Sequence, residues 1–186
     1  MLKFLKGGDI KYSPTFFLTH KKWLYVLLAL LLVTLYKLDN DNFIVVKPQN
    51  YNLNTINVKV EKPEWLLRYK HSVQKTVVEE HFWINKDNIS LMYKTIYSSF
   101  GVGLPFLQSE GELSFIEDGR MQLNFANPRS FNVVMLWTGP EAEVVLLVNN
   151  ETINLYDIYP PGTLLEISVK SRYLLYWEMF CSKKIL

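Results

Sequence analysis

The chain has 186 residues, 49% hydrophobic and 20% charged, which suits one folded domain plus an appendage and excludes an intrinsically disordered protein. Its net charge of +2 is uneven, because the first 22 residues hold five lysines and one aspartate, leaving 15 basic and 17 acidic residues in the remainder. No stripe of Lys and Arg marks the remainder as a nucleic-acid-binding surface. The single cysteine, Cys181, excludes an internal disulfide.

The first predicted element is the uncharged apolar stretch Trp23–Tyr36, WLYVLLALLLVTLY. Aromatic residues at both ends and flanking lysines favour a membrane anchor over 23–38, with a cleaved signal peptide and a buried core helix as alternatives. Basic residues precede the stretch and acidic residues follow it, so we expect a single-pass cell-membrane protein with its N-terminus in the cytoplasm. The predicted organisation is a basic cytoplasmic tail (1–22), the anchor (23–38), a juxtamembrane spacer with the first strands (39–62) and an extracytoplasmic β-domain (63–186).

The rest of the chain alternates short β-branched and aromatic runs with turn signals, and no helical periodicity follows the predicted anchor. Turns are expected at Asn85–Asn88, Asp118-Gly119, Asn127-Pro128, Asn149-Asn150 and Pro160–Gly162, and the segment 172–180 closes the domain. The pattern predicts an all-β fold, an antiparallel β-sandwich or barrel of about 8–10 strands. The expected strands are 43–46, 56–60, 65–73, 78–84, 89–97, 111–116, 121–125, 131–137, 144–148, 152–155 and 164–169.

The segment Arg68–Phe82, RYKHSVQKTVVEEHF, is the densest group of polar side chains in the chain. Alternation predicts a hairpin that turns near Lys75 and places His71 and Glu80 on the apolar side of its two strands. An imidazole and a carboxylate buried there are expected to hydrogen-bond each other, because an unpaired buried charge is costly. The pair is either a polar site in a cavity or a structural contact that fixes the hairpin register.

Other chemistry is weaker in the sequence. His71, Glu79 and His81 are residue types that bind metals, but alternation sends them to different faces, so no metal or other cofactor is expected. Ser72 and His71 are adjacent on a strand and cannot form a nucleophile–base pair, so no enzyme activity is expected.

The loop 101–105 could hold an anion with its backbone amides or simply bend the chain between two strands. Most of four tryptophans fit core positions, although a partner-binding patch is the alternative: Trp65, Trp83, Trp137 and Trp177.

The motif His71-Ser-Val-Gln-Lys-Thr76 with Glu79-Glu80-x-Phe82 resembles a bacterial family called domain of unknown function 1850. The loop Gly101-Val-Gly-Leu-Pro105 and Pro161-Gly162 extend the resemblance over 65–169, while Gln74 departs from the usual glutamate. The family comprises small exported or anchored proteins, often encoded beside TRAP-type solute transporters, without an established activity.

The resemblance implies a non-enzymatic accessory module that docks on a transporter subunit or solute receptor. A small-ligand-binding domain is the alternative, and a hydrolase a further one. The residues expected to bind a ligand or partner are His71, Ser72, Lys75, Glu79, Glu80, Gly101, Gly103 and Pro105.

Overall fold

The computed structural model describes residues 14–50, 52–99, 105 and 107–182, and the chain divides into two compact units, Met1–Leu38 and Asp39–Leu186. Helix α1 (Pro14–Asn40) carries the apolar stretch, and the side chains described on it, 22–36, are exposed. Among the described residues, no helix has both the length and the apolar character needed to cross a membrane.

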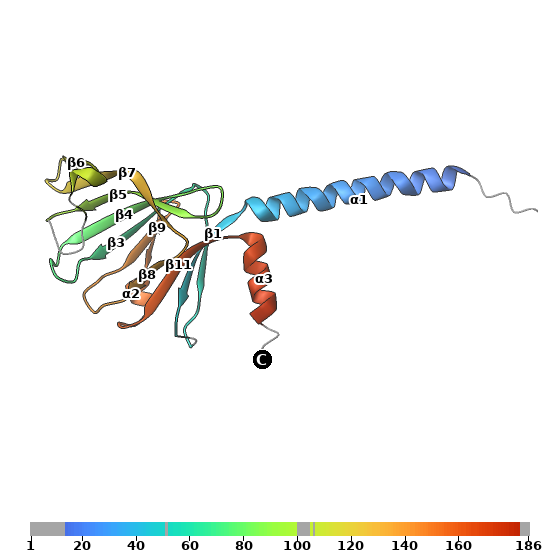
Figure 1. Ribbon diagram of the computed structural model, residues 1–186. Helices are drawn as coiled ribbons and strands as arrows, with labels where there is room; N and C mark the ends of the chain where they lie inside the picture. The colour runs from blue at the N-terminus through green and yellow to red at the C-terminus, as the bar shows by residue number, and fades with distance from the viewer. Residues whose placement is uncertain (1–13, 51, 100–104, 106, 183–186) are drawn as a thin grey trace, which may run out of the picture. The chain divides into compact units, whose positions relative to one another are not determined.

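The second unit contains two antiparallel sheets (Figure 1), as the all-β prediction requires. The smaller sheet has the strand order β2-β1-β11-β8. Its strands are β2 (Ile56–Lys59), β1 (Asn42–Pro48), β11 (Leu164–Ser171) and β8 (Val134–Trp137). The first and last long strands of the unit are therefore neighbours, and Asn42 pairs with Ser171 at one end of the sheet.

The larger sheet has the order β10-β9-β3-β4-β5-β7-β6. Its strands are β10 (Glu151–Asn154), β9 (Val145–Val148), β3 (Glu64–Lys70), β4 (Val77–Ile84), β5 (Ser90–Tyr97), β7 (Met121–Phe131) and β6 (Gly111–Phe115). A 3₁₀ turn, η1 (Gln108–Glu110), precedes β6. The described residues thus form eleven strands, as many as the expected strand ranges, although the predicted total was about 8–10.

One hydrophobic core lies between the two sheets, which is the arrangement of a β-sandwich. Ile44, Val46 and Ile167 come from the smaller sheet, and all three are almost completely buried. From the larger sheet, Trp65 stacks on Phe82 of the neighbouring strand with ring centroids 4.1 Å apart. Alternate residues of β3 and β4 therefore face the core, and the residues between them form the outer face of the larger sheet.

Two helices correct the expectation that no helix follows the anchor. The short α2 (Leu155–Ile158) comes directly after β10 and buries Leu155. The closing segment forms α3 (Arg172–Ser182), which continues from the end of β11 (Figure 1). The many Tyr and Trp residues in this segment favour strands when considered alone, but in the structure they lie on a helix.

Strand β7 corrects a predicted break, because it continues through Asn127-Pro128 to Phe131. The pairing with β5 jumps from Lys94–Asn124 to Met92–Arg129, so residues 125–128 form an irregular bulge opposite Tyr93. Pairing with β6 ends at Phe125. Proline has no backbone N–H to donate. Pro128 is tolerated here because it lies in the bulge, where the strand makes no ladder hydrogen bond.

The tryptophans correct the predicted core. Trp65 is buried, and its indole nitrogen donates a 3.3 Å hydrogen bond to Ser90. In contrast, Trp83, Trp137 and Trp177 expose 43%, 64% and 56% of their surface. Trp83 alternates on β4 with the buried Phe82 and Ile84. It therefore lies on the outer face of the larger sheet, among the polar neighbours that alternation predicted, and not in the core.

Candidate functional site

The hairpin of β3 and β4 has a register that contradicts the predicted direct pairing of His71 and Glu80. Leu67, not His71, lies opposite Glu80, and His71 is four residues further along, about 13 Å at strand spacing. Glu80 does lie on the core-facing side, as predicted, and accepts a 3.0 Å hydrogen bond from the Tyr69 hydroxyl. The partner that satisfies the buried carboxyl is therefore a phenol on the adjacent strand.

Burial controls the ionisation of this pair. It raises the pKa of Glu80, although the hydrogen bond from Tyr69 and the charge of Arg129 act in the opposite direction. Burial and the Glu80 carboxylate also raise the pKa of the Tyr69 phenol well above its usual value, so Tyr69 remains a donor. Glu80 and Tyr69 together form a satisfied polar contact at the inner face of the sheet.

His71 holds the turn between the two strands. Its Nδ1 accepts hydrogen bonds from the backbone N–H groups of Val73 (3.3 Å) and Gln74 (3.2 Å). The backbone N–H of His71 donates a 2.8 Å hydrogen bond to the Thr76 carbonyl, and the His71 carbonyl accepts a 2.9 Å hydrogen bond from the backbone N–H of Lys75. These contacts order a turn in which Lys75 has a left-handed φ of 54°.

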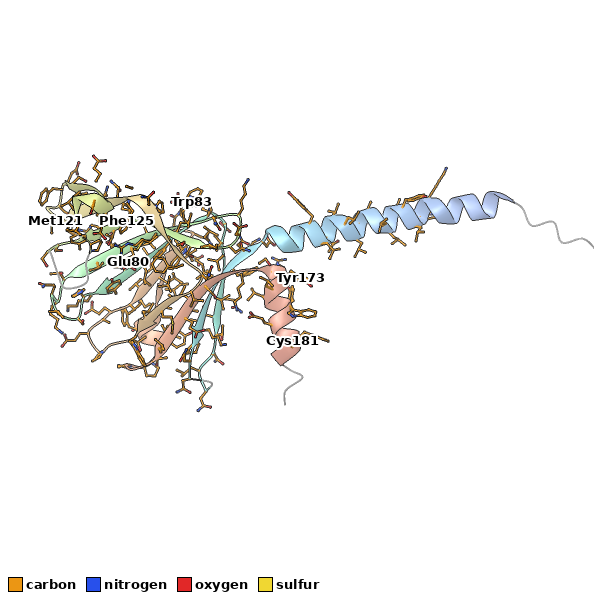
Figure 2. The ribbon with its side chains drawn as sticks, in the orientation of Figure 1. Glu80, Trp83, Met121, Phe125, Tyr173 and Cys181 are labelled. Carbon is orange, nitrogen blue, oxygen red and sulfur yellow. The ribbon has the colours of Figure 1, made fainter. Side chains whose placement is uncertain are left out.

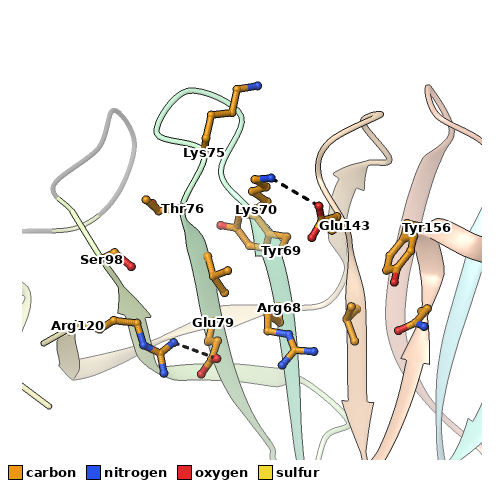
Figure 3. A pocket seen from close by; sticks show the side chains of 13 residues that line it. Arg68, Tyr69, Lys70, Lys75, Thr76, Glu79, Ser98, Arg120, Glu143 and Tyr156 are labelled. Carbon is orange, nitrogen blue, oxygen red and sulfur yellow. Dashed lines mark hydrogen bonds and ion pairs between the residues drawn. The ribbon is translucent and has the colours of Figure 1, made fainter. Parts of the chain in front are cut away.

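The outer face of the larger sheet carries an open groove of about 640 Å³, which we call the outer groove (Figure 3). The groove crosses four adjacent strands, β10, β9, β3 and β4. Each strand contributes a lining residue: Asn154, Val145, Arg68 and Glu79, respectively. Its volume lies in the range typical of small-molecule sites. Its remaining lining residues are Tyr69, Lys70, Lys75, Thr76, Val77, Ser98, Arg120, Glu143 and Tyr156.

Positive charge predominates in the outer groove, whose lining includes four cationic side chains and only two carboxylates, those of Glu79 and Glu143. Lys70 forms a 3.6 Å ion pair with Glu143, and Lys75 binds Glu141 outside the groove. Arg120 bridges Glu79 at 3.1 Å and Asp118 at 2.7 Å. The surplus cation is Arg68.

Arg68 lies beside Glu79, opposite it in the strand register, yet the Glu79 carboxylate is engaged by Arg120 on its other side (Figure 3). Within the part of the chain that the structure describes, no carboxylate forms an ion pair with Arg68. The side chain is half-buried, so its guanidinium is partly removed from water. A planar guanidinium with unused donors is suited to bidentate binding of a carboxylate or phosphate.

Glu79 is held ionised by its neighbours. His81, whose Nε2 lies 3.9 Å from one carboxylate oxygen, and Arg120, which donates to the other, lower the pKa of Glu79 to about 2, against the effect of burial. The carboxylate therefore remains a charged acceptor that fixes Arg120 in the groove wall.

Comparison with known proteins bears on this same segment. Residues 66–155 match the family described as Domain of unknown function (DUF1850). The chain carries a DUF1850 domain. This confirms the family that the motif predicted, over a shorter stretch. No curated protein and no solved structure gives a significant match.

The DUF1850 domain separates the residues expected to form one site. Lys75 and Glu79 line the outer groove, whereas Glu80 faces the core. His71 and Ser72 border a different hollow of about 440 Å³, beside Trp137. Gly101 and Gly103 lie outside the described residues. The Pro105 carbonyl accepts a 2.5 Å hydrogen bond from the Tyr97 hydroxyl.

Sequence reasoning missed several residues of the groove, among them Arg68, Lys70, Arg120 and Glu143. Of all the residues that line the outer groove, only Tyr156 lies outside the matched segment 66–155. The available signal was the alternation that puts Arg68 and Lys70 on the face opposite Trp65 and Leu67. The contribution of β9 and β10 depends on strand order, which alternation does not contain.

Proposed function

We propose that this protein is a membrane-anchored, non-enzymatic binding module whose outer groove accepts a small molecule bearing a carboxylate or phosphate group. The observation that carries the proposal is the Arg68 guanidinium, which has no ion-pair partner among the described residues and lines a groove of ligand size. Partly buried charges without partners are costly, so an anionic ligand would compensate Arg68.

The neighbouring side chains fit the same ligand class. Lys70 follows Arg68 on the same face of β3, at a separation of about 7 Å, and its ion pair with Glu143 is long. A ligand with two anionic groups could therefore contact both cations. Ser98, Asn154 and Tyr156 add neutral hydrogen-bonding groups around the groove.

The proposal includes the location expected from the sequence, with the anchor at 23–38, the N-terminus in the cytoplasm and the β-domain outside. It is supported by the apolar side chains of α1 from Trp23 to Tyr36, which are exposed and therefore need an apolar environment.

A thermal-unfolding screen tests ligand binding. The full-length protein, purified in a non-ionic detergent, is heated with acetate, succinate, citrate or inorganic phosphate, with chloride at equal ionic strength as the reference. A ligand at ten times its Kd adds about 1.4 kcal/mol to the stability of the folded state. We expect at least one of these anions to raise Tm in the wild-type protein and to do so much less in Arg68→Met.

The control variant is Lys86→Met, which removes one positive charge from an exposed turn distant from the groove in the strand register. It should respond to the anions as the wild-type protein does. Equal responses in all three proteins, or no response to any of the four anions, would refute the proposed ligand class.

Docking on a membrane transporter is the second candidate function, and β8 favours it. This strand is an edge of the smaller sheet, and Met135 and Trp137 on it are largely exposed. An edge strand with exposed apolar side chains is a typical protein-docking surface. The family resemblance suggests the partner, a TRAP-type transporter subunit or its solute receptor.

In-cell photocrosslinking separates this candidate from the first. A photoreactive amino acid at Met135 should capture a TRAP-type transporter subunit, while the same group at Glu151, on an exposed part of β10, should not. Capture of the subunit from both positions, or from neither, would count against docking through β8.

A further inference from the structure

Helix α3 carries a row of exposed aromatic side chains, which we call the aromatic stripe: Tyr173, Tyr176, Trp177 and Phe180. They expose 51%, 58%, 56% and 62% of their surface. Their spacing of three, four and seven residues places them on one side of the helix. Figure 2 shows Tyr173 at the first turn of α3 and Cys181 near its end. Four exposed aromatic rings on one helix face indicate a surface that is covered when the protein functions.

The start of α3 is tied to the residues that follow the proposed anchor. The guanidinium of Arg172 forms a 2.6 Å ion pair with Asp41, and the Arg172 N–H donates a 2.8 Å hydrogen bond to the Asp41 carbonyl. Asp41 is only five residues beyond Tyr36, the last residue of the apolar stretch. Even a fully extended chain covers at most about 18 Å over five residues. If the apolar stretch of the proposed anchor is embedded in the bilayer, the first turn of α3 is therefore held close to the membrane surface.

The composition and length of α3 fit a bilayer surface. Tyr and Trp rings prefer the interface between headgroups and acyl chains. The 11 residues of α3 span about 16 Å, about half of a hydrocarbon core, so the helix suits lying in the plane of the membrane rather than crossing it. The sequence continues with Lys183-Lys184, a positive charge suited to anionic headgroups.

We propose that α3 lies on the lipid bilayer, with the aromatic stripe in the headgroup layer, as a second membrane contact beside the end of the anchor. This inference rests on the proposed anchor. It gives the β-domain a defined orientation, with the Asn42–Ser171 end of the smaller sheet toward the membrane and the turn at Pro160–Gly162, at the other end of β11, away from it.

Site-specific fluorescence quenching tests this arrangement in the full-length protein. Cys181→Ser provides a cysteine-free chain, into which Tyr176→Cys, Leu31→Cys or Pro161→Cys is introduced and labelled with the environment-sensitive fluorophore NBD. The proteins are reconstituted in vesicles of phosphatidylethanolamine and phosphatidylglycerol that contain a lipid with a nitroxide on its acyl chain. Leu31 reports the anchor, and the exposed Pro161 is the distant control.

The expected result is a blue-shifted emission and strong quenching of the label at position 176, as at position 31, with neither change at position 161. If the label at 31 is quenched but the label at 176 behaves like that at 161, the anchor holds and the membrane contact of α3 is refuted. This outcome would leave a protein partner to cover the stripe.

The two proposals can also fail in other combinations. Quenching at 176 without quenching at 31 would establish the α3 contact and refute the anchor. No quenching at either position would refute both. A second label, at Trp177→Cys, is expected to give the same result as the label at 176, which guards against a local effect of one substitution.

Discussion

The Tyr69 hydroxyl donates a 3.0 Å hydrogen bond across the β3–β4 pair to the carboxylate of Glu80, on the core-facing side of the larger sheet. Glu80 has a raised pKa because of burial. A raised pKa means that the folded protein holds the proton more tightly than the unfolded chain does. The stability from this group is therefore complete below the unfolded pKa of about 4.3 and is lost as pH rises through the folded pKa.

Glu80→Gln should remove this pH dependence. The glutamine keeps an acceptor for Tyr69 but carries no charge, so its free energy of unfolding relative to the wild-type protein should rise as pH increases from below about 4.3 towards neutrality. Urea unfolding at a series of pH values measures the difference. The exposed Glu117→Gln is the control and should follow the wild-type curve. Parallel curves for Glu80→Gln and wild type would show that Glu80 does not titrate as described.

Glu79 on the outer face should have the opposite dependence. His81 and Arg120 lower its pKa to about 2, so its contribution to stability is present above about pH 4.3 and is lost as pH falls towards about 2. Glu79→Gln should therefore be less stable than the wild-type protein at neutral pH, and the two should converge in acid. Acid unfolding followed by circular dichroism measures this, with the exposed Glu151→Gln as control. A constant difference between Glu79→Gln and wild type across this range would contradict the ion pairs.

Thr138 joins the end of β8 to the turn before β11. Its buried hydroxyl donates to the Pro160 carbonyl at 2.7 Å and accepts from the Thr163 N–H at 2.9 Å. Thr138→Val preserves the shape but leaves the Thr163 donor without this acceptor, which should cost about 1–3 kcal/mol in the free energy of unfolding. Thr152→Val on an exposed position should change little. Similar losses for both variants would show that the Thr138 hydroxyl is not the cause.

Gly111 is required by a close approach of two strands. A Cβ on this residue would lie 1.9 Å from the carbonyl oxygen of Asn124 on β7, which is backbone and cannot rotate away. Gly111→Ala should therefore lower the free energy of unfolding by about 1–3 kcal/mol or detach β6. Gly139→Ala is the control, because its Cβ would meet only Ala142 at 3.4 Å. Equal stability of the two alanine variants, measured by urea unfolding, would contradict the β6–β7 pairing at this position.

Much of the fold could be predicted because alternation and turn residues are local. Asn149-Asn150 forms a turn with left-handed φ values of 52° and 66°, and Gly119 has φ 82°, as their sequence patterns indicate. The alternation of Arg68 and Lys70 with Leu67 and Tyr69 correctly separated the two faces of β3.

The rest depended on tertiary contacts that the sequence does not encode locally. Alternation identified the apolar side of each hairpin strand, but the strand ends at Lys70, so His71 became a turn residue and lost its place opposite Glu80. Trp137 lies on an edge strand, where its face is exposed. The outer groove needed the placement of β9 beside β3, a pairing between segments nearly 80 residues apart.

The central claim is that Arg68 binds a carboxylate or phosphate in the outer groove. The most direct measurement is a calorimetric titration of the full-length protein with acetate, succinate, citrate and inorganic phosphate, repeated with Arg68→Met and Lys86→Met. A hydrogen bond to a charged group contributes about 1.5–3 kcal/mol, so the anion that binds should do so at least about tenfold more weakly to Arg68→Met. Lys86→Met should retain the wild-type affinity. Binding of equal strength to Arg68→Met and wild type, or no binding of any of the four anions to the wild-type protein, would contradict the assignment of the groove.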